Sequence, residues 1–300
     1  MKSFSEIYEK VKGNDKLRVI AVAAAEDEPV LQAVAKAKEM GLCDAVLVGD
    51  EEKILSLLEG LSLDNTFRII PENNPAAAAK IAANLVREGE CDILMKGLVD
   101  TKSLLRAVLD KEKGLATGNL ISHLAAFEVP GYDRMLYVTD AAMNTYPGLK
   151  EKMGILHNAV AFVKSLGTLV PKVAVVCAVE VVNEAMQATV DAAMLAKMND
   201  RGQIKGCLVD GPLALDNALS LEAAEHKGIK SPVAGLADIL LMPNIESGNV
   251  LYKGLTYTTQ SKSGGVLLGA KAPVVVTSRA DSFESKVNSI AMAVLNASNS

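Results

Sequence analysis

Aromatic residues are scarce in this sequence, and tryptophan is absent. Phenylalanine and tyrosine supply 4% of the 300 residues, whereas hydrophobic residues of all kinds make up 50%. Alanine, valine, leucine and isoleucine must therefore fill the core, as they do in layered α/β proteins. The length favours two domains, and the apolar fraction allows a large core.

The sequence also lacks basic runs and long apolar runs. With a net charge of −5, we expect no nucleic-acid partner, although a local cluster of cations can still bind small anions. No apolar run approaches the ~20 residues that cross a bilayer, and the start, MKSFSEIYEKVKGNDK, has no signal-peptide core. We therefore expect a cytoplasmic protein with no membrane partner.

Cysteine and histidine are few and scattered. The four cysteines lie far apart, in or beside apolar runs, without a CxxC pair: Cys43, Cys91, Cys177 and Cys207. The three histidines show neither metal-ligand spacing nor a Ser/His/Asp order: His123, His157 and His226. Buried reduced thiols and no bound metal are the expectation.

Apolar runs alternate with helical patterns, which predicts βαβ units and parallel strands. Strands are expected at residues 17–25, 44–49, 67–71, 91–96, 135–139, 172–178, 204–210, 239–242 and 273–276. Helices are expected at residues 3–12, 27–41, 51–58, 75–87, 149–166, 183–199 and 282–297, with two more around 101–108 and from 247. The pattern breaks between Gly114 and Pro147, which we interpret as a domain junction and cleft wall.

Two strands between Ala237 and Ser282 end in small polar residues and a cation. Ser247 and Asn249 follow the first strand and open a helix that carries Lys253, and Thr277-Ser278-Arg279 follow the second. Ligands bind at the carboxyl ends of strands in open α/β sheets, where helix N-termini favour anions. Either turn alone is an ordinary βα turn, but two within fifty residues favour an anion site.

Further polar residues follow other strands, and each has a plain structural alternative. Lys96 ends a strand and Thr101 is expected to cap the next helix, which suits an anion site or a plain glycine turn followed by a helix cap. Arg106 and Arg134 point to the site or to solvent. Asp140, Asn144 and Thr145 follow the strand at 135–139, as in an Asx turn.

The segment Ser278-Arg279-Ala280-Asp281 is the sharpest candidate. Arginine suits bidentate phosphate binding, and a carboxylate near a substrate thiol can act as general base. The alternative is a helix N-terminus, with Ser282 as the cap and Glu284 in the first turn, and both interpretations can hold together.

Four segments of the chain resemble the phosphate acetyl/butyryl transferase family. They occur in the family's order: KGLVDTKSLLRAVL, DRMLYVTDAAMN, ADILLMPNIESGNVLYKGL and GAKAPVVVTSRADS. The KG and SRADS forms are more similar to the butyryl than to the acetyl members.

The resemblance implies an α/β, two-domain fold of the isocitrate/isopropylmalate dehydrogenase type, with mostly parallel sheets and an active site in the interdomain cleft. The domains expected are residues 1–137 with 284–300, and residues 138–283 with the Ser-Arg motif. It also implies a homo-oligomer, most simply a dimer.

The resemblance further implies a short-chain acyltransferase: acyl-CoA plus phosphate gives acyl phosphate plus CoA, with butyryl or branched acyl groups, by direct transfer in a ternary complex. CoA is then a substrate, and neither cofactor nor metal is required. The family's cleft arginines fall on Arg106 and Arg134, and its Ser-Arg pair on Ser278 and Arg279. The family's acidic base has two candidates here, Asp281 and Glu284.

Three other functions stay open at this point. A phosphate acetyltransferase differs in acyl preference alone. An oxidoreductase of the same fold usually needs clustered acids for a divalent metal, or histidines, and no such cluster is found in the sequence. A non-catalytic ligand-binding protein of this shape usually carries a secretory signal.

Overall fold

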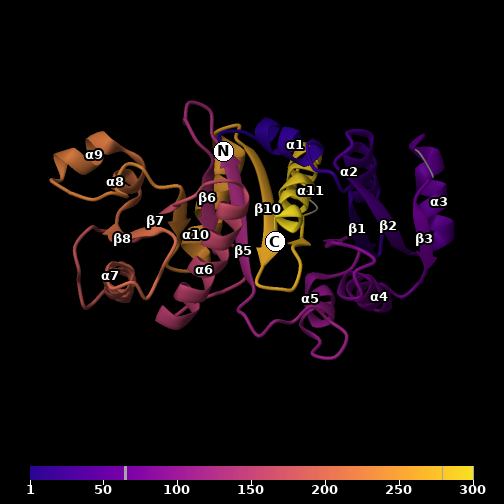
Figure 1. The fold of residues 1–300 in the computed structure, drawn as a ribbon, viewed down its shortest axis with the longest axis horizontal. Helices are drawn as coiled ribbons and strands as arrows, with labels where there is room; N and C mark the ends of the chain where they lie inside the picture. The colour runs from indigo at the N-terminus through magenta and orange to yellow at the C-terminus, as the bar shows by residue number, and fades with distance from the viewer. Residues whose placement is uncertain (64–65, 279, 300) are drawn as a thin grey trace. The chain divides into compact units, whose positions relative to one another are not determined.

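The computed structural model describes residues 1–63, 66–278 and 280–299, and the chain forms two compact units (Figure 1). The split unit comprises Phe4–Asn119 and Ser263–Ser300, and the middle unit comprises Met1–Ser3 and Leu120–Lys262. The expected domain limits were 137/138 and 283/284. The units place the Ser278 segment with the N-terminal strands, because the strand before it pairs with one of them.

The split unit contains strands in the order β3-β2-β1-β4-β11-β10. Neighbours from β3 to β11 are parallel, and β10 runs antiparallel to β11. The bounds are β1 Arg18–Ala23, β2 Cys43–Gly49, β3 Arg68–Pro71, β4 Ile93–Lys96, β10 Lys262–Leu268 and β11 Val274–Val275. β1 and β4 are largely buried, which explains their unbroken apolar sequences.

Helices of the split unit begin at polar caps. The side chains of Asp27, Asp50 and Asn74 each accept a backbone N–H in the first turn of the helix that follows. The bounds are α1 Phe4–Lys12, α2 Glu28–Glu39, α3 Glu51–Gly60, α4 Pro75–Arg87, α5 Thr101–Leu109 and α11 Phe283–Ser298. Figure 1 shows α11, in yellow, beside α1 and α2.

The last helix is buried on every side. Every residue from Ser285 to Leu295 is buried, as in a helix at the centre of a core. Its polar members bond to β10: the Ser289 hydroxyl accepts the Gly265 N–H at 2.9 Å, and the Asn288 amide donates to the Ser263 carbonyl at 2.9 Å. These bonds remove the cost of burying the polar groups.

The middle unit contains strands in the order β5-β6-β9-β7-β8. β5 and β6 form an antiparallel pair, and the other neighbours are parallel. The strands are β5 Ser122–Glu128, β6 Leu136–Thr139, β7 Lys172–Val176, β8 Leu208–Leu213 and β9 Ile239–Leu241. The helices are α6 Leu149–Ser165, α7 Gln187–Asp200, α8 Leu215–Leu219, α9 Leu221–His226 and α10 Ile245–Thr258.

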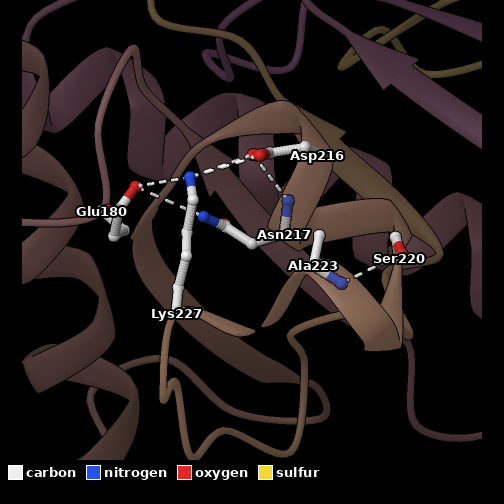
Figure 2. A network of polar contacts seen from close by, with 6 residues as sticks. All are labelled: Glu180, Asp216, Asn217, Ser220, Ala223 and Lys227. Carbon is white, nitrogen blue, oxygen red and sulfur yellow. Dashed lines mark hydrogen bonds and ion pairs between the residues drawn. The ribbon is translucent and has the colours of Figure 1, made fainter. Parts of the chain in front are cut away.

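An ion-pair network joins the loop after β7 to the short helices α8 and α9 (Figure 2). The Lys227 ammonium lies 3.1 Å from the Glu180 carboxylate and 3.2 Å from that of Asp216, and the Asn217 amide donates to Glu180 at 3.4 Å. Hydrogen bonding to Lys227 lowers the pKa of Glu180. The network fixes an otherwise exposed loop to the helices that follow β8.

The structure confirms the α/β class and most expected elements, but it adds two strands. β5 falls between Gly114 and Pro147, where the expected pattern breaks, and β10 lies between the strands expected at 239–242 and 273–276. The expected helix at 183–199 begins later, at Gln187, and the strand expected at 204–210 lies at Leu208–Leu213. No helix in the described part of the chain is both long and apolar enough to cross a membrane.

Candidate functional site

A pocket of about 310 Å³ opens in the split unit, where three parallel strands end. Its wall contains residues 26–30 after β1, residues 96–98 at the end of β4, and Thr277 and Ser278 after β11. Lys286 of α11 completes the part described here. The pocket therefore lies at the sheet edge where α/β proteins bind ligands.

Close contact between two strand ends shapes one side of this pocket. The Gly97 N–H donates to the Ala23 carbonyl at 2.9 Å, and the Leu98 N–H donates to the Ala24 carbonyl at 2.7 Å. A Cβ atom at position 97 would lie 2.1 Å from the Ala24 oxygen, so the position requires glycine. The Lys96 ammonium donates to the Gly97 carbonyl at 3.2 Å, which holds this cation at the end of β4.

Ser278 and Asp281 form a tight turn after β11. The Ser278 N–H donates to the Asp281 carboxylate at 2.7 Å, and the Asp281 N–H donates to the Ser278 carbonyl at 3.1 Å. The Ser282 hydroxyl accepts the Ser285 N–H at 3.1 Å. Ser282 is thus the helix cap that the sequence predicts, while Ser278 lines the pocket.

Lys286 is a pocket residue that the sequence reasoning missed. Its side chain is 2% exposed, and its ammonium donates to the Ser278 carbonyl at 3.2 Å and to the Asp281 carbonyl at 2.6 Å. The available signal was the helical spacing, because Lys286 lies four residues before the apolar Ile290 and so on the same side of the closing helix.

Three acids on the pocket wall were also missed as site residues. Asp27 caps α2 by accepting the Val30 N–H at 3.3 Å, and the Glu26 carboxylate accepts the Asp50 N–H at 3.3 Å. Glu28 is exposed. Their position after β1, like that of Lys96 at the end of β4, was the signal that could have identified them.

The start of α5 corrects one expected role. Asp100, not Thr101, is the helix cap, because its carboxylate accepts the Ser103 N–H at 2.9 Å. Hydrogen bonding to Ser103 lowers the pKa of Asp100. Thr101 and Arg106 are exposed on α5, and Glu284 is exposed on the first turn of α11. Arg279 lies outside the described residues.

A second group of the predicted residues meets in the middle unit, after β6. The Asp140 carboxylate accepts the Asn144 amide at 2.6 Å, and the Asn249 amide donates to the Ala141 carbonyl at 3.2 Å. A Cβ atom at Gly248 would lie 2.4 Å from the Asp140 carbonyl oxygen. The N-terminus of α10 therefore packs directly on the turn after β6.

The remaining polar residues near α10 have defined partners. Ser247 bonds to the cap of α10: its hydroxyl donates to the Asn244 side chain at 2.8 Å. The Lys253 ammonium lies 5.1 Å from the Tyr252 ring centroid and 5.7 Å from that of Tyr257. Lys253 thus lies beside two aromatic rings, farther along α10 than Ser247 at the start of the helix.

Arg134 lies at the other end of β6 from Asp140 and Asn144. It precedes the strand, and its guanidinium bonds to the Asp133 carboxylate at 2.8 Å. The hydrogen bond from Arg134 lowers the pKa of Asp133. Within the middle unit, the structure thus separates Arg134 from the polar cluster at the strand's carboxyl end.

The four cysteines are reduced and buried, as expected. Burial raises the pKa of Cys43 to about 12 and that of Cys91, Cys177 and Cys207 to about 11. Thiols of this kind stay protonated and unreactive at neutral pH. Residues 1–63, 66–278 and 280–299 contain no group of three or more acids, histidines or cysteines placed to hold a metal ion.

Comparison with known proteins identifies the class of the chain. A phosphate butyryltransferase of Clostridium acetobutylicum is 58% identical over 300 residues, which cover 100% of this chain and 99% of that protein. A phosphate acetyltransferase of Thermotoga maritima is 45% identical over 290 residues, 97% of this chain and 98% of that protein. The crystal structure of a branched-chain phosphotransacylase from Enterococcus faecalis matches with a TM-score of 0.83 at 33% identity, over 94% of this chain and 99% of that one. The class is that of the acyltransferases.

The particular family follows from a match to its sequence profile. The profile described as Phosphate acetyl/butaryl transferase matches residues 3–80 and 64–294. The chain belongs to the phosphate acetyl/butyryl transferase family, which confirms the resemblance stated from the four segments.

Proposed function

We propose that this chain transfers a short acyl group, butyryl or branched, between CoA and inorganic phosphate. The observation that carries the proposal is the 58% identity, over the whole chain, to a phosphate butyryltransferase. The reaction is acyl-CoA plus phosphate to acyl phosphate plus CoA, with CoA as a substrate and without a bound cofactor.

The pocket of the split unit suits the phosphate end of this reaction. Lys96 and Ser278 both line it and provide a cation and a hydroxyl donor. Arg279 follows Ser278 in the sequence, and we assign it a bidentate contact to phosphate on the chemistry of its guanidinium.

The chemistry needs one proton acceptor and one donor to the carbonyl oxygen. In the direction of acyl-CoA formation, the CoA thiol gives its proton to a carboxylate. The thiolate then attacks the acyl phosphate carbonyl, and the bond from this carbon to the phosphate oxygen breaks. We assign the carboxylate to Asp281, because it lies against Ser278, whereas Glu284 is the exposed alternative. The Ser278 hydroxyl donates to the developing oxyanion.

The remaining predicted residues are proposed as contacts to the rest of the substrates. Asn144, Ser247 and Asn249 meet around the N-terminus of α10, where backbone N–H groups favour anionic groups such as the phosphates of CoA. Lys253 on α10 and the exposed Thr101 and Arg106 of α5 provide further polar groups. We assign Arg134 to these substrate contacts as well, because it falls on one of the cleft arginines of the family.

Three finer statements belong to the same proposal. We propose a fold of the isocitrate/isopropylmalate dehydrogenase type, a dimer in solution and a cytoplasmic location. Analytical ultracentrifugation tests the dimer.

Phosphate-dependent CoA release tests the function. The assay compares acetyl-, propionyl-, butyryl-, isobutyryl- and octanoyl-CoA, and we expect butyryl-CoA to give a higher kcat/KM than acetyl-CoA. Each buried CH₂ contributes about 0.8 kcal/mol, so two give roughly tenfold or more. A preference for acetyl-CoA supports the phosphate acetyltransferase alternative, and no release with any substrate rejects the proposal.

The order of transfer is tested with the same assay. We expect initial-rate plots for acyl-CoA and phosphate to intersect, as in a ternary complex, because the buried cysteines are poor nucleophiles. Parallel lines together with a stable acyl adduct on the protein would contradict direct transfer.

A further inference from the structure

The two most buried lysines of the chain differ in how their charge is compensated. Lys152 of α6 is 4% exposed and lies 2.6 Å from the Asp191 carboxylate. Lys286 of α11 is 2% exposed, and its two acceptors are the neutral carbonyls of Ser278 and Asp281. Among residues 1–63, 66–278 and 280–299, no carboxylate lies within ion-pair distance of Lys286.

A buried ammonium group without a counter-charge is costly. The two carbonyl oxygens accept two of its three N–H donors but do not neutralise it, and removing such a cation from water carries a penalty of several kcal/mol. A position of this kind persists when something else compensates the charge. Lys286 lines the pocket of about 310 Å³, so a bound anion is placed to do so.

The acids of the pocket do not provide this compensation. Glu26 and Asp27 each accept a backbone N–H, from Asp50 and Val30 respectively, both at 3.3 Å. Glu28 is exposed and accepts the Gln32 amide at 3.3 Å. Their carboxylates are thus directed to groups other than the Lys286 ammonium.

We infer that Lys286 forms part of the phosphate subsite, as the buried counter-charge of the substrate phosphate and the anchor of the Ser278–Asp281 turn. The inference rests on the proposed function for the identity of the anion. The ammonium bonds to the carbonyls at both ends of the turn that carries Ser278. One side chain therefore places both a positive charge and the Ser278 hydroxyl at the same pocket.

The test compares Lys286→Met, Lys286→Arg and the control Lys152→Met. Methionine keeps the length of the side chain and removes its charge and donors, whereas arginine keeps both. Two measurements are made on each protein: thermal unfolding with and without inorganic phosphate, using sulfate-free buffer of fixed ionic strength, and the KM values for phosphate and for butyryl-CoA.

We expect phosphate to raise the Tm of the wild-type protein and of Lys152→Met, because a ligand that binds the folded state stabilises it. Lys286→Met should lose this shift and raise the phosphate KM by roughly ten- to hundredfold, with the butyryl-CoA KM within about twofold. Lys286→Arg should recover most of the phosphate affinity. A merely structural role would lower the Tm without separating the two KM values.

The inference is overturned when folded Lys286→Met keeps the wild-type Tm shift and phosphate KM. Where that variant does not fold, Lys286→Gln replaces it, since its amide can still donate to a carbonyl, and the same outcomes decide. A wild-type protein that is stabilised by phosphate through Lys286 but releases no CoA supports the anion subsite and rejects the proposed reaction. Conversely, if the wild-type protein releases CoA and Lys286→Met keeps the wild-type Tm shift and phosphate KM, the proposed reaction is supported and the role of Lys286 in the phosphate subsite is rejected.

Discussion

Ser278 and Asp281 share one turn, yet we expect their side chains to contribute unequally to the reaction. Asp281→Asn preserves an oxygen that can accept the Ser278 N–H, a bond of 2.7 Å, but it can no longer take the proton of the CoA thiol. We expect a loss in kcat of about 10³–10⁴ for Asp281→Asn. Ser278→Ala should lose roughly 10²–10³-fold, because it removes one neutral donor to the oxyanion.

The pH profile separates the two roles. Asp281→Asn should flatten the acid limb of kcat for CoA acylation, whereas Ser278→Ala should leave its position unchanged. Glu284→Gln is the control for the alternative base. The assignment is wrong when Glu284→Gln shows the larger loss, or when Ser278→Ala is more damaging than Asp281→Asn.

The ion pair between Lys152 and Asp191 is a residue-scale determinant of stability. Both side chains are 5% exposed, and their charged atoms lie 2.6 Å apart. Lys152→Met leaves a buried carboxylate without its cation, so the free energy of unfolding should fall by about 3–5 kcal/mol. Urea unfolding measures this value.

A matched control is available on α7. Lys197 pairs with Asp200 at 3.0 Å, but both side chains are more than 60% exposed, and solvent screens such a pair. Lys197→Met should change the urea midpoint very little. Equal effects of the two substitutions would show that burial does not decide the contribution of these pairs.

At the scale of elements, the junction of β1 and β4 depends on Gly97. An alanine Cβ would lie 2.1 Å from the Ala24 oxygen and 2.8 Å from the Ala23 oxygen. Backbone has to move to relieve this overlap, so Gly97→Ala should lower stability by about 1–3 kcal/mol and reduce phosphate-dependent activity. Chemical unfolding and the CoA-release assay test both effects.

Gly60 offers the comparison within the same unit. It is the last residue of α3, and a Cβ atom there meets no atom within 4 Å. Gly60→Ala should be neutral or add up to about 1 kcal/mol of stability, because alanine favours the helix. Similar losses at both glycines would contradict the close-contact argument.

The sequence predicts elements well where local chemistry decides them. α4 begins and ends where the pattern of Pro75 to Arg87 predicts, because a cap and an alanine-rich run set its limits. β5 and β10 escape prediction, since SHLAAFE and KSGGVLL are poor in β-branched residues. Their small residues are explained by packing: a Cβ at Gly264 would lie 3.0 Å from Met292 and from the Ser289 nitrogen of α11.

Residues of the candidate site, too, can be predicted only where the local sequence decides their position. Lys96 and Ser278 can be predicted because one ends an apolar strand and the other follows one, at the edge where ligands bind. Lys286 cannot be placed from its neighbours alone, because its role depends on which turn of α11 lies beneath Ser278 and Asp281. Arg134 was expected on its family position, and its location before β6 is set by the β5–β6 pair.

For the molecule as a whole, the four buried thiols give stability a predictable pH dependence. Their pKa values rise from 9.0 to about 12 for Cys43 and about 11 for the other three. Between pH 9 and 11, the unfolded chain releases protons that the folded chain retains. The unfolded state therefore binds fewer protons, and the free energy of unfolding must fall as pH rises through this window.

Urea unfolding at pH 7.0, 8.0, 9.5 and 10.5 measures that slope. The stabilising contribution is fully present below pH 9, so the values at pH 7 and 8 should agree as far as these thiols are concerned. A variant with Cys91 replaced by alanine should show a shallower slope. An unchanged slope in this variant would mean that other groups cause the alkaline loss.

The order in which the strands are synthesised has a consequence for the protein while it is still on the ribosome. β4 lies between β1 and β11, but about 180 residues separate Lys96 from Val274 in the sequence. A nascent chain that has completed the continuous segment 120–262 therefore still exposes one edge of β4 and has not yet made α11. Unpaired strand edges promote incorrect association of growing chains. This incomplete chain is therefore the species that should depend most on chaperones.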